Sequence, residues 1–140
     1  MSRLAQNTMI RAIILVLLFT GSVFATDLRI TDTTNTVLVV HNAFIDYGGM
    51  MGDKEPEGLR IYQGEAIVTA RWANIRSLTF TGKDTSAPPR LKADIIPRKG
   101  NKISTTLVSK GRMKLSGRTD LGEYAIDLEK VRSIEPIAPE

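Results

Sequence analysis

Beyond residue 35, the apolar residues of the chain fall into short runs in which apolar and polar positions alternate. In a strand, this alternation places successive side chains on opposite faces. No segment repeats its apolar residues every 3.6 positions, as an amphipathic helix would. Turns containing glycine or proline separate the runs at close spacing, which is typical of a small sandwich or barrel. The pattern therefore predicts an all-β fold.

The expected strands flank recognisable turns. Residues 36–47 read as one long strand, or as two strands joined by a bend at His41-Asn42. Residues 48–58 are rich in glycine and charge, which predicts a loop. Gly64 marks a tight hairpin, because glycine readily takes the positive φ that such turns need. Strands are expected at 59–62, 66–72, 76–81, 91–96, 102–108, 112–115, 123–128 and 132–136.

A four-residue pattern occurs twice. Ile75-Arg76-Ser77-Leu78 matches Val131-Arg132-Ser133-Ile134, 56 residues later. When the two patterns are aligned, the inward-facing positions of the strands before them also coincide. The stretches before the two patterns differ in length by an even number of residues, so the same side chains still face inward. We therefore expect two copies of a strand, a one-turn kink and a strand, with Ile75 and Val131 buried at the kinks and the two arginines outside. Repeat 1 covers about 37–81, a linker about 82–90, and repeat 2 about 91–136; coincidence among short β-patterns is the alternative.

The second copy carries a resemblance. Residues 115–136, LSGRTDLGEYAIDLEKVRSIEP, are similar to the closing segment of small exported bacterial β-modules, with the pattern L-x-G-x-T-x-x-G-x-x-x-I-x-L-x-x-[IV]-x-x-I. The ending of strand, single turn and strand also resembles an SH3-like barrel. The resemblance implies either a small sandwich or a pair of SH3-like half-barrels built from two related β-repeats. The positions that match are mostly structural, so no activity is implied. Leu115, Gly117, Thr119, Gly122, Ile126, Leu128, Val131 and Ile134 meet the pattern.

Residues 1–25 have the parts of a secretory signal peptide. Arg3 and Arg11 precede the apolar run 12–19, and Val23-Phe24-Ala25 provides a cleavage site. A retained membrane anchor is the alternative, but Gly21-Ser22 interrupts the run well before the ~20 apolar residues that span a bilayer. We expect export through a Sec-type signal, cleavage after Ala25, no membrane span after processing, and a single all-β domain at 26–140 in the periplasm or cell envelope.

Composition excludes several classes of function. The 19 basic residues include Arg3 and Arg11, whose removal leaves 17 against 15 acidic residues and a formal charge of +2. So small an excess does not indicate a nucleic-acid partner. The chain has no cysteine, which excludes a disulfide scaffold and a thiol nucleophile. A small exported domain without disulfides fits a bacterial periplasm best.

Basic residues gather at 90–118. If successive hairpins lie side by side, Lys92, Lys102, Arg112 and Lys114 share one sheet face, which would attract an anionic envelope polymer or an acidic protein partner. Two alternatives stay open. Exposed strands use lysine to prevent edge-to-edge pairing, and a basic part of the domain can dock on an acidic part.

Candidate catalytic chemistry is sparse. His41 is the one histidine, and no G-x-S-x-G elbow or zinc-ligand spacing accompanies it. Asp53, Glu55 and Glu57 alternate in a charged stretch without EF-hand spacing, so we expect no metal and no cofactor. We favour a non-catalytic exported envelope module that binds a protein partner or an anionic envelope polymer. The alternative is a small periplasmic hydrolase that uses His41 and these carboxylates.

Overall fold

The computed structural model describes residues 26–49, 51–108 and 112–138, so the predicted signal peptide lies outside the described residues. The described residues form strands and two short 3₁₀ turns, without an α-helix, which confirms the all-β prediction. None of their helical segments is long and apolar enough to cross a membrane. The elements are β1 (Leu28–Asp32), β2 (Val37–Gly48), β3 (Asp53–Glu55), β4 (Gly58–Gln63), β5 (Ala66–Arg71), η1 (Trp72–Asn74), β6 (Ile75–Lys83), β7 (Leu91–Pro97), β8 (Ile103–Thr106), β9 (Lys114–Thr119), β10 (Gly122–Asp127), η2 (Leu128–Lys130) and β11 (Val131–Pro136).

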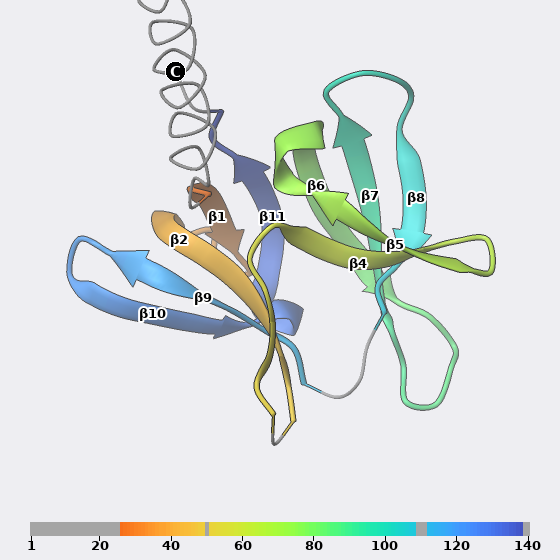
Figure 1. The fold of residues 1–140 in the computed structure, drawn as a ribbon, viewed down its shortest axis with the longest axis horizontal. Coiled ribbons are helices and arrows are strands. Elements are labelled where there is room, and N and C mark those ends of the chain that lie inside the picture. Colours follow the sequence, from red (N-terminus) through yellow and green to blue (C-terminus); the bar gives the residue numbers. More distant parts are fainter. Residues whose placement is uncertain (1–25, 50, 109–111, 139–140) are drawn as a thin grey trace, which may run out of the picture.

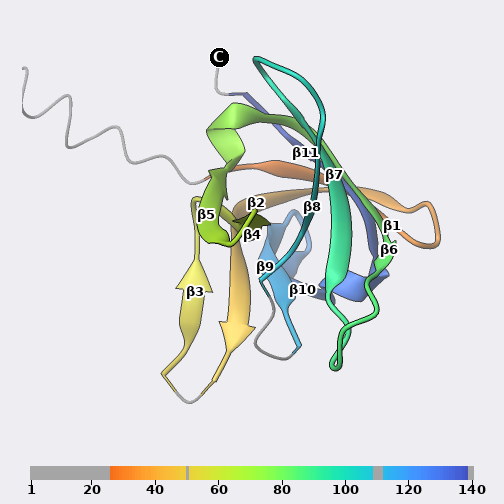
Figure 2. The ribbon, with the colours of Figure 1, turned by 90° about the vertical axis from the view of Figure 1, so that its right-hand side faces the viewer.

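Most strands belong to one strongly curved antiparallel sheet. Its order is β10-β9-β2-β1-β11-β6-β7-β8, with β3 paired to β2, while β4 and β5 form a separate hairpin. Figures 1 and 2 show that the molecule has two halves, one with β1, β2, β9, β10 and β11 and the other with β4 to β8. The two halves meet where β6 pairs with β11. We call this junction the seam.

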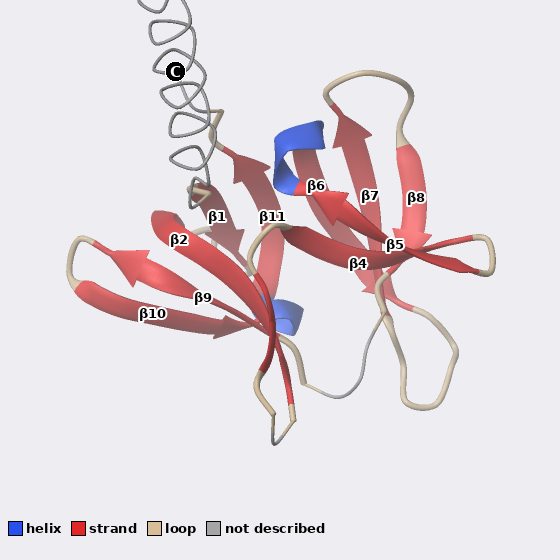
Figure 3. Cartoon of the chain, viewed as in Figure 1, coloured by secondary structure: helices blue, strands red, loops and turns tan. Residues whose placement is uncertain are grey.

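Each half contains a hairpin, a single 3₁₀ turn and a strand in succession. The turns η1 and η2 lie at opposite ends of the seam (Figure 3). Ile75 and Val131, which follow the turns, are both 2% exposed, whereas Arg76 and Arg132 are exposed, as the aligned sequences predicted. The alternation of the preceding strands sends Trp72 and Leu128 into the core, where both are fully buried.

The strands that flank these units in space are not those that come immediately before them in the sequence. β7 comes after β6 in the chain and pairs with it, and β8 pairs with β7. In the other half, β1 pairs with β11 and β2 pairs with both β1 and β9. A single bridge between Ile61 and Leu107 connects β4 to the segment after β8. Each half is thus a circuit of five strands: neighbouring strands pair, and the 3₁₀ turn joins the first strand to the last.

The structure corrects several expected elements. β1 is an additional strand, and β3 lies within residues 48–58, which the sequence predicted to be a loop. β9 runs to Thr119, so residues 116–119 are strand rather than connection. β2 is one strand rather than two: it bulges against β9 between His41 and Phe44, where Asn42 has a φ of 54°. The bulge absorbs the expected bend without ending the strand.

Candidate functional site

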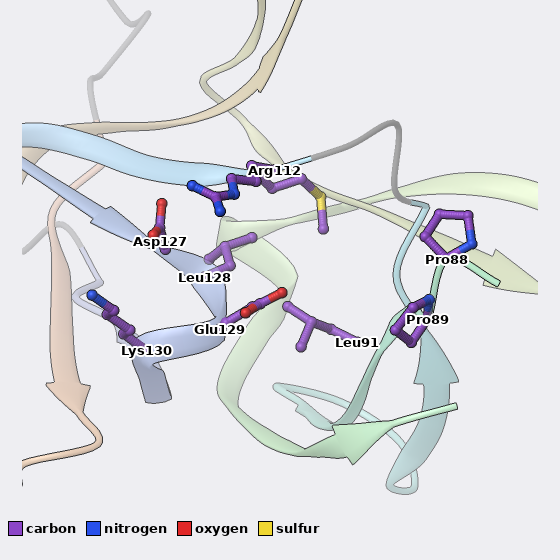
Figure 4. A pocket seen from close by; sticks show the side chains of 9 residues that line it. Pro88, Pro89, Leu91, Arg112, Asp127, Leu128, Glu129 and Lys130 are labelled. Atoms are coloured by element: carbon purple, nitrogen blue, oxygen red, sulfur yellow. The ribbon is translucent and has the colours of Figure 1, made fainter. Parts of the chain in front are cut away.

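A cleft of about 530 Å³ opens at one end of the seam, next to η2. Its volume lies within the range usual for ligand pockets. Figure 4 shows side chains from both halves around it, and we call it the seam cleft. Its lining residues are Pro88, Pro89, Leu91, Arg112, Met113, Asp127, Leu128, Glu129 and Lys130.

The floor of the seam cleft is apolar. Leu91 begins β7, Met113 precedes β9 and Leu128 begins η2; their exposed fractions are 9%, 6% and 1%. The Leu128 backbone N–H donates to the Met113 carbonyl over 3.0 Å, which fixes the turn against the strand. Because the three residues already belong to the packed core, the floor is preformed, and it can take an apolar group without rearrangement.

One wall of the seam cleft is the loop of residues 84–90, whose two ends are held together by hydrogen bonds of Asp84. An oxygen of Asp84 accepts hydrogen bonds from the backbone N–H of Arg90 at 2.8 Å and of Ser86 at 3.1 Å, and the Asp84 N–H donates to the Arg90 carbonyl at 2.9 Å. The hydrogen bonds that this carboxylate accepts, first that from the Arg90 N–H and next that from the Ser86 hydroxyl, lower the pKa of Asp84 below its usual 3.8. The loop presents Pro88 and Pro89 to the cleft as a short, stiff wall (Figure 4).

The rim of the seam cleft carries acidic and basic side chains, which differ in whether a group of opposite charge already lies beside them. Glu129 is paired across the seam with Lys83 of β6, with 3.4 Å between Nζ and Oε1. Asp127 lies directly opposite Lys114 in the β9–β10 register. Within the described residues, the side chains of Arg112 and Lys130 have no ion-pair partner. The cations are therefore available to a ligand, whereas the carboxylates already have basic neighbours.

A second, shallower hollow of about 210 Å³ adjoins the seam cleft. It is lined by Lys114, Ala125, Ile126, Asp127 and Lys130, so Asp127 and Lys130 border both hollows. Together the two form one surface with three cations, Arg112, Lys114 and Lys130, and two carboxylates, Asp127 and Glu129. An acidic ligand that has an apolar group would find matching chemistry on this surface.

The structure divides the four predicted basic residues into two pairs. Arg112 and Lys114 border the two hollows. Lys92 is exposed on β7. The Nζ of Lys102 lies 3.8 Å from Oδ2 of Asp94, which is also on β7. Between β9 and β7 the sheet order places β2, β1, β11 and β6. The four residues thus do not lie on neighbouring hairpins, and their binding role stays a prediction.

His41 lies between two carboxylates on the outer surface of β2. Its Nδ1 is 2.9 Å from Asp27 Oδ2, and its Nε2 is 3.8 Å from Asp120 Oδ1 at the tip of the β9–β10 hairpin. A carboxylate beside an imidazole orients the ring, as in a catalytic triad, but a triad also needs a nucleophile. The observed contacts tie three chain segments together and do not include a hydroxyl.

The charged segment 53–57 lies elsewhere. Glu55 pairs with Ile45 of β2. Ile45 comes four residues after His41, and four residues of a strand span about 13 Å. The Asp53 carboxylate accepts a bidentate pair of hydrogen bonds from the Arg60 guanidinium, at 2.7 and 2.9 Å. The Cζ of Arg60 in turn lies 4.4 Å from the centroid of the Tyr47 ring. His41 and these carboxylates therefore do not form one site. No group of three potential metal ligands occurs within the described residues.

Sequence analysis missed most of the seam cleft. Its floor residues lie in the core, and nothing in a strand pattern indicates that two halves leave a gap between them. Asp127 ends a strand that was correctly expected, and Glu129 and Lys130 follow it, but their proximity to Pro88 and Leu91 depends on the pairing of β6 with β11. The stiff Pro88-Pro89 step was the one local signal.

Comparisons with known proteins give no relative for this chain. No family model matches it. Neither the curated protein sequences nor the solved structures contain a match. The functional argument therefore rests on the geometry of the chain itself.

Proposed function

We propose that the protein is an exported, non-catalytic module of the cell envelope that binds an acidic segment of a partner protein in the seam cleft. The observation that carries this proposal is the combination of a buried apolar floor with Arg112 and Lys130 at the rim, neither of which has an ion-pair partner in the described part of the chain. The floor suits an apolar side chain of the partner. The two cations suit carboxylates on either side of it, since complementary charge speeds and orients association.

An anionic envelope polymer is the second candidate. A polyanion binds best along a row of cations, because each phosphate or sulfate then meets a positive charge. The separation of Lys92 and Lys102 from Arg112 and Lys114 in the sheet order favours the localised cleft over such a row. The charged groups of such a polymer would also make no favourable contact with the apolar floor.

Export is the part of the proposal that rests on residues 1–25. The tripartite pattern of Arg3 and Arg11, the apolar run and the Val23-Phe24-Ala25 site supports removal of this segment. Intact-mass measurement of the protein from the exporting cell should give a chain that begins at Thr26. A full-length species in the membrane fraction would contradict removal.

We also infer that the two halves are related SH3-like half-barrels. The circuit β5-β4-β8-β7-β6 corresponds to β10-β9-β2-β1-β11, with η1 and η2 at equivalent places. The flanking pair follows the unit in one half (β7 and β8) and precedes it in the other (β1 and β2). The halves are thus related by a circular permutation, which explains why a linear repeat search finds only the shared strand, turn and strand.

The binding proposal is tested by affinity capture from an envelope extract, with the protein from exporting cells immobilised. The double variant Arg112→Ser/Lys130→Ser should retain at least tenfold less of the partner than the wild type does. Lys92→Ser/Lys102→Ser, which removes the same charge away from the cleft, should retain it normally. Equal loss in both variants would instead favour the polymer, and equal retention in both would contradict a role for the cleft.

A further inference from the structure

The strand β5 has an unprotected edge. It pairs with β4 alone, so its other edge is open in the part of the chain that the structure describes. Natural proteins protect such edges with lysine, proline, bulges or inward charges. From Ala66 to Ala70, β5 carries none of these, and Ile67 on its outer face is 59% exposed. The edge is therefore a site where another strand can add.

The backbone groups that face this edge can be identified. The Trp72 N–H donates to the Glu57 carbonyl over 2.8 Å, continuing the β4–β5 ladder by one step. Hydrogen-bonded pairs alternate along an antiparallel ladder, so the even-numbered residues of β5 bond to β4. The N–H and C=O groups of Ile67 and Thr69 and the N–H group of Arg71 consequently point to the open edge, while the Arg71 carbonyl, at the N-cap of η1, serves the first bond of the turn.

We propose that β5 pairs antiparallel with β5 of a second copy of this chain, about a two-fold axis at Val68. In this register, Ile67 forms a hydrogen-bonded pair with Thr69 of the second copy, and Glu65 comes opposite Arg71 of the second copy. The two-fold axis generates each of these pairs twice. Each copy thus supplies one acid and one base to the interface, and Arg71 also has Glu57 of its own chain nearby, with 3.9 Å between Nε and Oε2.

Other registers lack this match. Since odd-numbered residues must bond to odd-numbered residues, the neighbouring registers are centred on Ile67 or on Thr69. The first places Glu65 opposite Thr69, and the second places Arg71 opposite Ile67. Charge complementarity therefore selects the register centred on Val68, because opposite charges directly across a ladder stabilise it.

The strand β10, the counterpart of β5 in the other half, lacks this self-complementarity. It also pairs with one strand alone, β9. Its outward residues include Glu123 and Asp127, and the register centred on Ala125 would place these two carboxylates opposite each other in both pairs. Like charges directly opposite are destabilising. Charge complementarity between two copies of the same strand is therefore found at β5 and not at β10, and β5 contributes no residue to the seam cleft.

Charge exchange tests this dimer. In sedimentation equilibrium of the exported protein, Arg71→Glu and Glu65→Arg should each weaken dimerisation at least tenfold. An equimolar mixture of the two variants should restore it, because both ion pairs re-form between unlike chains. Lys92→Glu, a charge reversal at an exposed position of β7, serves as the control and should leave the dimer unchanged. A wild-type protein that stays monomeric up to about 1 mM, or a mixture that fails to restore dimers, would overturn the proposal.

A cysteine variant tests the register independently of charge. The chain has no cysteine, so Val68→Cys introduces a single thiol. Directly opposite residues in a non-hydrogen-bonded pair have Cα atoms about 4.5 Å apart, which a disulfide can bridge. Under oxidation, Val68→Cys should give a covalent dimer faster than Ile67→Cys or Thr69→Cys does. Faster linkage in either of those two variants would contradict the register.

Discussion

Leu78 and Ile134 are direct cross-strand partners at the centre of the seam, and both are fully buried. Each is the third residue after the buried residue that follows a 3₁₀ turn, Ile75 in one half and Val131 in the other. Equivalent positions of the two halves thus meet where β6 pairs with β11. This contact fixes the two halves relative to each other, and therefore also fixes the opening of the seam cleft.

Truncation of this pair should show coupling. Leu78→Ala and Ile134→Ala should each lower the free energy of unfolding by about 2–5 kcal/mol, since each removes buried carbons and leaves a cavity. Because the two side chains face each other, the double variant should cost measurably less or more than the sum of the single variants. Denaturant unfolding of the three variants measures this. Additive costs would contradict contact between these residues.

The residues that follow the two turns should behave alike. Ile75→Ala should cost about 2–5 kcal/mol, and Val131→Ala somewhat less because valine loses fewer carbons. Arg76→Ala is the matched control, exposed and adjacent to Ile75, and should stay within about 0.5 kcal/mol. The same unfolding experiment decides the matter. A tolerant Val131→Ala would show that the two halves do not depend on equivalent contacts.

Gly117 should be intolerant of any side chain. A Cβ at this position would lie 2.5 Å from Val40 Cγ1 and 2.7 Å from the His41 carbonyl oxygen, because the bulged part of β2 runs close to β9 there. Gly117→Ala should therefore cost about 1–3 kcal/mol of stability. Ser116→Ala, one residue away, is the control and should be nearly neutral. A stable Gly117→Ala variant, measured by thermal unfolding, would contradict this close approach.

Acid should loosen the wall of the seam cleft. The folded-state pKa of Asp84 lies below 3.8, so its stabilising effect is present above that value and is lost as pH falls through the folded pKa. Asp84→Ala should thus melt at a lower temperature than the wild type near neutral pH. The difference should shrink from about pH 5 to about pH 2. A difference that does not change with pH would show that the charge of Asp84 is not what closes the loop.

Local pattern predicted much of the fold, since alternation identified most strands and the aligned strand, turn and strand units placed Ile75 and Val131 in the core. β3 could not be predicted in this way. Its sequence, Asp53-Lys54-Glu55, has no strand preference, and it is extended because β2 provides a partner. The seam cleft depends on contacts between residues far apart in the chain, such as Lys83 with Glu129, which no local pattern reports.

The central proposal, that the seam cleft holds a segment of a partner protein, is tested most directly by site-specific photocrosslinking in the cell that produces the protein. A photoreactive benzoylphenylalanine in place of Pro89, on the cleft wall, should give one discrete protein adduct, which disappears in the Arg112→Ser/Lys130→Ser background. The same group in place of Lys99, exposed in the β7–β8 loop, should give no such adduct. A polydisperse adduct at Pro89, or the same adduct from both positions, would contradict the claim.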